Sequence, residues 1–293
     1  SIYLASLCFY YLLNMPEEIN PYLFICFKSF FLGIIQGFTE FLPISSTAHL
    51  KVVPYFFGWN DPGVSFSASV QLGSAVAIIY YFRNQISLII DSFFSVLKHR
   101  KGFKDDDSRL SIYIFVASIP IFVFGLLIKI YWPNYSESNV RGLFSIAVTS
   151  IFMALLLALS EIYGKRNKLF ADVNLNDVIL LGFAQSLALF PGVSRSGITL
   201  TSALFSGIER QTAARLSFLV GIPAISISGL VELLSLFRVS SVIDILPIII
   251  GIISSFFSSI LAIDLFLKFL SKNNTLVFVY YRLAFGVFIL SAL

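Results

Sequence analysis

The chain has 293 residues, of which 57% are hydrophobic and 12% are charged, and its formal net charge is +4. Soluble domains carry roughly twice that share of charged residues, so this composition excludes an ordinary soluble protein and predicts an all-α protein that crosses a membrane several times. The small, scattered positive charge does not indicate nucleic-acid binding, and it fits basic loops beside an anionic cytoplasmic leaflet.

Six segments are apolar over about the 20 residues that a membrane-spanning helix requires. Two further apolar regions, about 21–58 and 175–207, are interrupted by Pro, Gly and polar clusters. Irregular backbone is tolerated at membrane depth only where protein or water covers it, so each interrupted region is predicted to be a re-entrant hairpin of a broken helix. The six predicted spans are residues 64–82, 110–132, 142–163, 214–237, 242–270 and 275–293.

The two interrupted regions resemble each other in sequence. The stretch "LGIIQGFTEFLPISSTAH" begins at Leu32 and "LGFAQSLALFPGVSRSGI" begins at Leu181, an offset of 149 residues. Three predicted spans follow each stretch, and an odd number of spans per unit gives two copies of opposite orientation. We therefore predict one integral membrane domain over residues 1–293, built as an inverted-topology repeat of about 21–163 and about 175–293. The offset aligns Gly33 with Gly182, Gln36 with Gln185, Phe41 with Phe190, and Ser45 with Ser194.

Loop charges predict the orientation of the chain. Basic residues gather in the connections 83–109 and 164–172 and around the last turn, at Lys268 and Lys272. The stretches "PNYSESNVR" and "RVSSVID" carry one basic residue each. The positive-inside rule then places the first three connections in the cytoplasm and the last two outside.

The first interrupted region combines one carboxylate, one imidazole and two hydroxyls. Gln36 and Glu40 are four residues apart and share a helix face. The proline that follows can end this helix, which leaves Ser45 or Ser46 near the cap of the next one. His49 is expected to return to the face of those hydroxyls, so the set suits acid–base chemistry.

The second interrupted region supplies groups that bind anions. In "PGVSRSGIT", residues 191–199, Ser194 can cap a helix whose free N–H groups attract negative charge. Arg195 adds a planar donor fork suited to phosphate, and Ser196 and Thr199 add hydroxyls. We predict a phosphate-binding wall that faces the acid–base wall of the first region.

Several polar residues also have a purely structural interpretation. Gln36 and Gln185 occupy matching positions and suit hydrogen bonds that pin helices together as well as they suit chemistry. Arg282 is either a second phosphate ligand or a structural charge. Lys129 and Glu161 lie near span ends, where long side chains reach the interface.

With these residues in hand, the chain resembles the undecaprenyl-pyrophosphate phosphatase family, also called the bacitracin-resistance (BacA) type. The resemblance is carried by "QGFTEFLPISSTAH" (36–49) and "PGVSRSGIT" (191–199), supported by "ARLSFLVGIP" (214–223), and it extends over nearly the whole chain. It implies an inverted repeat with two re-entrant helix pairs. It also implies an enzyme that removes one phosphate from undecaprenyl pyrophosphate, leaving the monophosphate lipid carrier of bacterial cell-wall synthesis.

The resemblance further implies a site that faces the periplasm from the inner membrane and uses a divalent cation, Mg²⁺ or Ca²⁺. The family often has Glu at the position of Gln36, whose amide oxygen can ligate a cation but brings no charge, so Glu40 is the only carboxylate of the expected metal site. By position, the functional core is Glu40, Ser46, His49 and Arg195, with Ser194, Ser196 and Thr199 on the phosphate side.

Two chemical routes and one rival function stay open at this point. Either Ser46 attacks phosphorus with His49 as its base, or His49 and Glu40 activate a water. The rival is a polyprenyl-phosphate flippase or secondary transporter, because broken helices in inverted repeats are typical of transporters. The expected partners are a polyprenyl diphosphate lipid and the bilayer, with a homodimer as an alternative to the monomer and without nucleic acid.

Overall fold

The computed structural model describes residues 21–61, 63–99, 106–239 and 242–293. Over these residues the chain is built from helices, with one isolated bridge between Lys168 and Ile208. Short 3-10 turns, η1 (Tyr135–Glu137), η2 (Asn139–Arg141), η3 (Phe170–Asp172) and η4 (Leu187–Leu189), lie between them. The α-helices in chain order are α2 (Pro21–Phe41), α3 (Ser46–Phe56), α4 (Gly63–Tyr81), α5 (Arg83–His99), α6 (Asp106–Tyr131), α7 (Leu143–Tyr163), α8 (Leu175–Ser186), α9 (Arg195–Phe205), α10 (Arg210–Val239), α11 (Val242–Leu270) and α12 (Leu276–Ser291).

The predicted all-α membrane architecture is confirmed. The helices that are long enough to cross a membrane differ in two places from the predicted spans. Helices α2, α6, α7, α10 and α11 are long and apolar enough to cross a membrane, and the bent pair α4–α5 adds a sixth candidate. We expected a span over 275–293, but α12 has only 16 residues. We expected no clean span in 21–58, but α2 has 21 residues, because the polar break begins only after Phe41.

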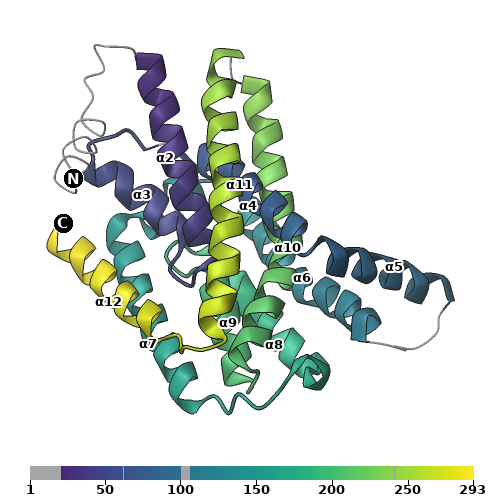
Figure 1. Ribbon diagram of the computed structural model, residues 1–293. Coiled ribbons are helices and arrows are strands. Elements are labelled where there is room, and N and C mark those ends of the chain that lie inside the picture. Colours follow the sequence, from purple (N-terminus) through teal and green to yellow (C-terminus); the bar gives the residue numbers. More distant parts are fainter. Residues whose placement is uncertain (1–20, 62, 100–105, 240–241) are drawn as a thin grey trace, which may run out of the picture.

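The connection 83–109, which we predicted as a loop, contains the helix α5. The chain bends by 82° between α4 and α5, and α5 then packs along α6 as an arm that extends from the bundle (Figure 1). Ile86, Ile89 and Phe93 recur at helical spacing. The ring of Phe93 lies 6.0 Å from that of Phe115 on α6, so this apolar stripe explains the helix.

Both predicted breaks lie at the expected positions and have the same local geometry. Ser45 precedes α3 with φ of 72°, and Ser194 precedes α9 with φ of 69°. Residues with a Cβ rarely adopt positive φ. Each hydroxyl accepts a hydrogen bond from the backbone N–H three residues later, at 3.4 Å from Ala48 and 3.1 Å from Gly197. This match at an offset of 149 residues supports a duplication, and the opposite orientation of the two copies stays a prediction.

Close helix packing holds α2 in place. Helices α2 and α11 lie side by side (Figure 1). A Cβ on Gly33 would come within 2.3 Å of the Gly251 carbonyl oxygen, and one on Gly37 within 2.5 Å of the Ser255 carbonyl oxygen. Only glycine permits this approach, which sets the distance between the two backbones.

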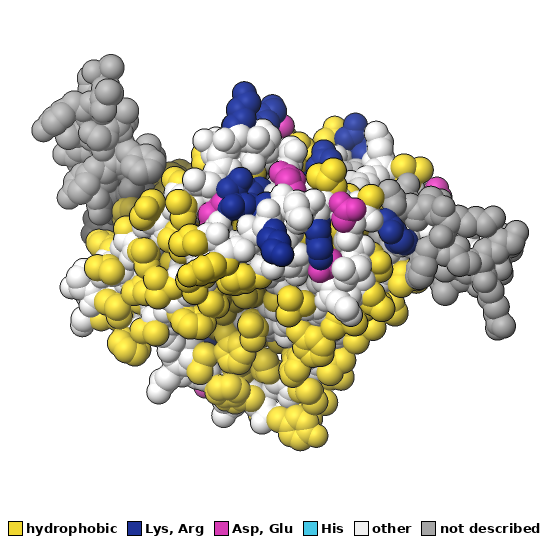
Figure 2. Space-filling view, turned by 90° about the horizontal axis from the view of Figure 1, so that it is seen from below, with side chains coloured by type: hydrophobic (Ala, Val, Ile, Leu, Met, Phe, Trp, Pro, Cys, Tyr) yellow, Lys and Arg dark blue, Asp and Glu magenta, His cyan; other side chains and the backbone are white. Residues whose placement is uncertain are grey.

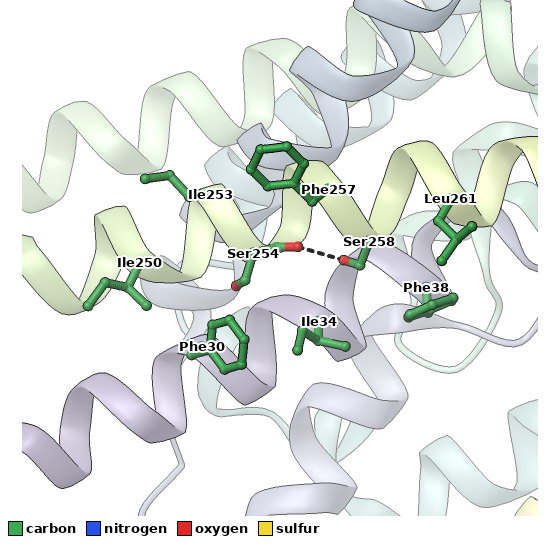
Figure 3. Close-up of a pocket in the computed structure, with 9 residues that line it drawn as sticks. All are labelled: Phe30, Ile34, Phe38, Ile250, Ile253, Ser254, Phe257, Ser258 and Leu261. Carbon is green, nitrogen blue, oxygen red and sulfur yellow. Dashed lines mark hydrogen bonds between the residues drawn. The ribbon is translucent and has the colours of Figure 1, made fainter.

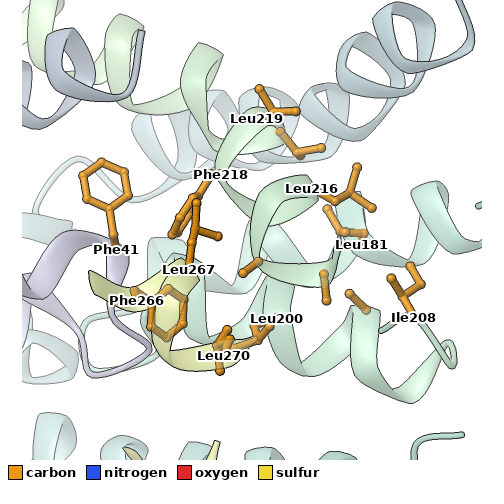
Figure 4. Packing of buried hydrophobic residues seen from close by; sticks show 14 of the residues in the cluster. Phe41, Leu181, Leu200, Ile208, Leu216, Phe218, Leu219, Phe266, Leu267 and Leu270 are labelled. Atoms are coloured by element: carbon orange, nitrogen blue, oxygen red, sulfur yellow. The ribbon is translucent and has the colours of Figure 1, made fainter. Parts of the chain in front are cut away.

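The largest apolar cluster among the described residues anchors the end of α2. Phe41 is fully buried, and its ring meets the edge of Phe218 at 5.2 Å. Around this pair, side chains of α9, α10 and α11 fill the interior, including Leu200, Leu216 and Phe266 (Figure 4). Because Glu40 directly precedes Phe41, this packing also fixes the position of the Glu40 carboxylate.

Basic side chains gather on one end of the molecule, where Figure 2 shows a group of Lys and Arg bordered by hydrophobic side chains. An ion cluster joins three helices at this end. Glu161, which we expected to reach toward the interface, is instead buried and accepts hydrogen bonds from Arg166, from Arg210 and, at 2.7 Å, from the Thr275 hydroxyl. Each of its carboxylate oxygens therefore has partners, as a buried charge requires.

Candidate active site

A cavity of about 680 Å³ lies between the two breaks and helices α4, α6 and α10. One wall is polar and contains side chains from both interrupted regions. The opposite wall is apolar and is made by α6 and α10, including Phe122, Leu126, Ile227 and Val231. The cavity therefore combines a polar pocket with a hydrocarbon-like surface.

The Glu40 carboxylate is the centre of the polar wall. Its Oε2 accepts hydrogen bonds from the Ser46 hydroxyl at 2.6 Å and from the Gln36 amide at 2.9 Å. Its Oε1 accepts from the Gln71 amide at 3.0 Å and from Arg195 Nη2 at 3.0 Å. A buried carboxylate is costly unless it is paired, and here both oxygens are paired by groups from α2, α3, α4 and α9.

Arg195 uses only part of its guanidinium in this contact. Its Nε and Nη1 are buried and have no hydrogen-bond partner, while Nη2 holds Glu40. The guanidinium lies against the backbone of α10, where a Cβ on Gly221 would be 1.4 Å from Nη1. Buried donors of this kind are normally satisfied, and Arg195 lines the cavity, so its guanidinium has hydrogen-bonding capacity left for an anion.

The other residues predicted on the phosphate side differ in position. Ser194 lines the cavity. Ser196 and Thr199 are not among its lining residues: Ser196 donates to the Leu42 carbonyl at 2.9 Å, and Thr199 donates to the Arg195 carbonyl at 2.7 Å. In the structure these two hydroxyls hold the break and the first turn of α9 together.

His49 does not approach Ser46, which is the main difference from the expected arrangement. Its Nδ1 is hydrogen-bonded to the Ser45 carbonyl at 2.8 Å, and its Nε2 to the Tyr281 hydroxyl at 2.6 Å. The ring stacks on Phe285 at 4.4 Å, and it is not part of the cavity lining. Ser46 begins α3 and reaches back to α2, whereas the turn of the helix carries the imidazole toward α12.

The sequence left two roles open for Arg282, a second phosphate ligand or a structural charge. In the structure its contacts are those of a structural charge. It is 1% exposed, and its guanidinium donates to the carbonyls of Pro43 at 3.1 Å, Val193 at 3.1 Å and Gly192 at 2.6 Å. Its Nε donates to the Ser150 carbonyl at 3.3 Å. One side chain of α12 thus ties both breaks to each other and to α7.

Sequence reasoning missed the place of Gln71, Lys129 and Arg141 in the cavity. Gln71 lies within the apolar span α4, and a polar side chain at membrane depth was the signal that could have found it. Lys129, expected only to reach the interface, lines the cavity together with Arg141. No sequence motif marks those two cations.

The donor set fits a divalent cation only in a limited way. Among the described residues, no three His, Cys, Asp or Glu side chains are grouped to hold a metal. Glu40 is the one carboxylate among the described residues that line the cavity, beside the amides of Gln36 and Gln71 and the Ser46 hydroxyl. Mg²⁺ is commonly bound by one or two carboxylates plus substrate phosphates and water. The site therefore suits a cation that takes most of its ligands from a phosphorylated substrate.

Residues 29–288 match the family described as Bacitracin resistance protein BacA. The chain belongs to the BacA family. Its relatives include the undecaprenyl-diphosphatase of Prochlorococcus marinus (strain NATL1A), which is 88% identical over 279 residues, covering 95% of this chain and 100% of the relative. The undecaprenyl-diphosphatase of Prochlorococcus marinus (strain MIT 9303) is 51% identical over 266 residues, covering 91% and 90%. That of Synechococcus sp. (strain WH7803) is 51% identical over 264 residues, covering 90% and 92%.

The resemblance inferred from the two polar stretches is thus confirmed for the BacA family. Both stretches lie within the matched range, as do all the residues that surround the Glu40 carboxylate.

A second hollow, of about 440 Å³, lies between α2 and α11 (Figure 3). Its hydroxyls are bonded within α11: Ser258 donates to the Ser254 carbonyl at 2.8 Å, and Ser254 donates to the Gly251 carbonyl at 3.0 Å. The other lining side chains are apolar, so this hollow of the BacA-family fold offers no group for catalysis. The apolar side chains that line this hollow are those of Phe30, Ile34, Phe38, Ile250, Ile253, Phe257 and Leu261.

Proposed function

We propose that this BacA-family chain is a membrane enzyme that hydrolyses undecaprenyl diphosphate to undecaprenyl monophosphate and inorganic phosphate. One observation carries the proposal: the Ser46 hydroxyl donates to the Glu40 carboxylate at 2.6 Å, beside an arginine with two nitrogens that have no hydrogen-bond partner. The apolar wall of the same cavity suits the lipid chain of such a substrate, and the relatives named undecaprenyl-diphosphatase support the choice of substrate.

Arg195 binds the phosphates in this proposal. Its Nε and Nη1 donate to phosphate oxygens, and its charge stabilises the negative charge that builds up in the transition state. Ser194, at the restarted end of α9, adds the field of a helix N-terminus. Glu40 and α10 hold the Arg195 guanidinium beside the cavity in the absence of substrate.

The hydrogen bond from Ser46 to Glu40 favours the serine route with Glu40, rather than His49, as the base. The Ser46 oxygen attacks the terminal phosphorus, its proton passes to Glu40, and the bond from that phosphorus to the bridging oxygen breaks. Undecaprenyl monophosphate leaves, and water then hydrolyses the phosphoserine. His49, bonded to the Ser45 carbonyl and to Tyr281, acts as a positioning residue for the start of α3.

A divalent cation, Mg²⁺ or Ca²⁺, belongs to the proposal. Glu40 would hold it, with the amide oxygen of Gln36 or Gln71 and the substrate phosphates completing its ligands. When bound, the cation would neutralise charge on the diphosphate.

The proposal places the site at the periplasmic side of the inner membrane. Connection 164–172 follows α7 and is basic, whereas the residues between α6 and α7 line the cavity. These two connections flank α7, whose 21 residues span about 30 Å. With the basic end in the cytoplasm, the cavity opens on the opposite side.

The test is phosphate release by purified protein from a polyprenyl diphosphate, with and without EDTA. Arg195→Ala, Glu40→Gln and Ser46→Ala are each expected to lower kcat/KM by about 10²-fold or more, the size of effect seen when one transition-state contact is removed. Ser67→Ala is the matched control, because Ser67 lines the same cavity but donates to the Gly63 carbonyl of its own helix.

Each outcome has a distinct meaning. Near-normal turnover in Ser46→Ala would exclude the serine route, and near-normal turnover in Arg195→Ala would exclude the phosphate contact. Movement of undecaprenyl phosphate across proteoliposomes without phosphate release would contradict the proposed function in favour of a transporter.

A further inference from the structure

Two cations line the same cavity from elements that contribute nothing to the Glu40 cluster. Lys129 belongs to the last turn of α6, and Arg141 ends η2. Neither forms an ion pair with a carboxylate within the described part of the chain. They come from the two ends of the connection between α6 and α7, and together they are called the basic rim below.

The basic rim is attached to the second break through Tyr135. The Tyr135 hydroxyl donates to the Leu189 carbonyl at 2.6 Å, directly before that break. The Arg141 guanidinium lies over the Tyr135 ring, 5.6 Å from its centroid, a favourable cation–π distance. Burial raises the pKa of Tyr135, so the phenol stays protonated and keeps this hydrogen bond. Of the two rim residues, Arg141 is therefore held at a defined place beside the site.

The charged residues of the cavity lining show that the basic rim gives the cavity its net charge. Glu40 and Arg195 neutralise each other at the inner end. Lys129 and Arg141 are the remaining charged residues among the described residues of the lining. All of the net positive charge of the cavity therefore comes from the rim, although a diphosphate head brings more than one negative charge.

We propose that Lys129 and Arg141 form a second phosphate-binding site, which draws the diphosphate head into the cavity and holds inorganic phosphate as it leaves. This inference rests on the proposed function. The rim attracts phosphate by charge from the aqueous connection between α6 and α7, while Arg195 and Ser46 act at the inner end. Mutation of a rim charge typically alters association and salt dependence rather than the chemical step.

Steady-state kinetics of Lys129→Gln and Arg141→Gln on a polyprenyl diphosphate test the proposal. Each change is expected to raise KM by up to about fivefold, as for one exposed charge contact, while kcat stays within about twofold. The increase of KM with NaCl concentration is expected to become shallower, because fewer charges remain to be screened. The inhibition constant of added inorganic phosphate is expected to rise as well.

Three controls make the result specific. Lys272→Gln removes the same charge from the exposed basic end of the molecule and is expected to leave KM unchanged. Lys129→Arg and Arg141→Lys keep the charge and are expected to restore the salt dependence. Thermal unfolding of each variant shows whether the fold is intact.

An unchanged KM and salt slope in both Gln variants would overturn the inference, and so would a loss of kcat at constant KM. A raised KM with an unchanged phosphate inhibition constant would overturn the exit role and assign the rim to the lipid diphosphate alone. If the wild-type protein released no phosphate at all, the proposed function would fail first, which is a separate result.

Discussion

Replacing Gly221 by alanine tests whether the observed position of Arg195 is the one used in the reaction. The added Cβ would lie 1.4 Å from Nη1 and 2.5 Å from Cζ of Arg195. Since nonbonded heavy atoms settle about 3.5 Å apart, the guanidinium would have to move by about 2 Å. A shift of that size breaks the 3.0 Å contact between Nη2 and Glu40.

The expected result for Gly221→Ala is a loss of about 10²-fold in kcat/KM, because even about 1 Å of misplacement of a catalytic group has this effect. The assay is phosphate release from a polyprenyl diphosphate. Gly125→Ala is the matched control: Gly125 lines the same cavity, but its added Cβ meets only Leu189 Cδ2, at an ordinary 3.8 Å. Near-normal kcat/KM in Gly221→Ala, with the protein folded, would refute the reasoning, since Arg195 would then act from another position.

Three further predictions concern the residues that support the site. Arg282→Met removes the donor of three buried carbonyls at the breaks, those of Pro43, Val193 and Gly192. It is expected to cost at least about 3 kcal/mol of stability, measured by thermal unfolding in detergent; an unchanged midpoint would contradict the role of Arg282 in tying the breaks. Glu161→Gln removes the charge that holds two arginines at the basic end, so the unfolding midpoint falls while KM stays constant; a changed KM at an unchanged midpoint would contradict a structural role. Tyr281→Phe deletes the partner of His49 Nε2 and is expected to lower kcat/KM by less than about tenfold, whereas a loss as large as that of Ser46→Ala would return His49 to the chemistry.

Local sequence was sufficient for the all-α membrane class and for the two breaks, but not for the spans at α2 and α12 or for the helix α5. The lengths of the apolar runs decide which segments can be helices in a bilayer, and Pro43 and Pro191–Gly192 interrupt helices by backbone geometry alone. The capping geometry of Ser45 and Ser194 likewise depends on the residues next to them. These features were predictable because each involves neighbours within a few residues.

The assembled site depends on contacts between distant segments. The ion pair of Glu40 and Arg195 joins residues 155 positions apart, and the motifs predicted that they would face each other but not that they would bond. Gln71 enters from α4, and the rotation of α3 sends His49 toward Tyr281. No local pattern encodes these directions, because they follow from how the helices pack. The net positive charge of the cavity could not be predicted from the sequence for the same reason. Only the packing of α6 and η2 brings Lys129 and Arg141 to the cavity in which Glu40 and Arg195 neutralise each other.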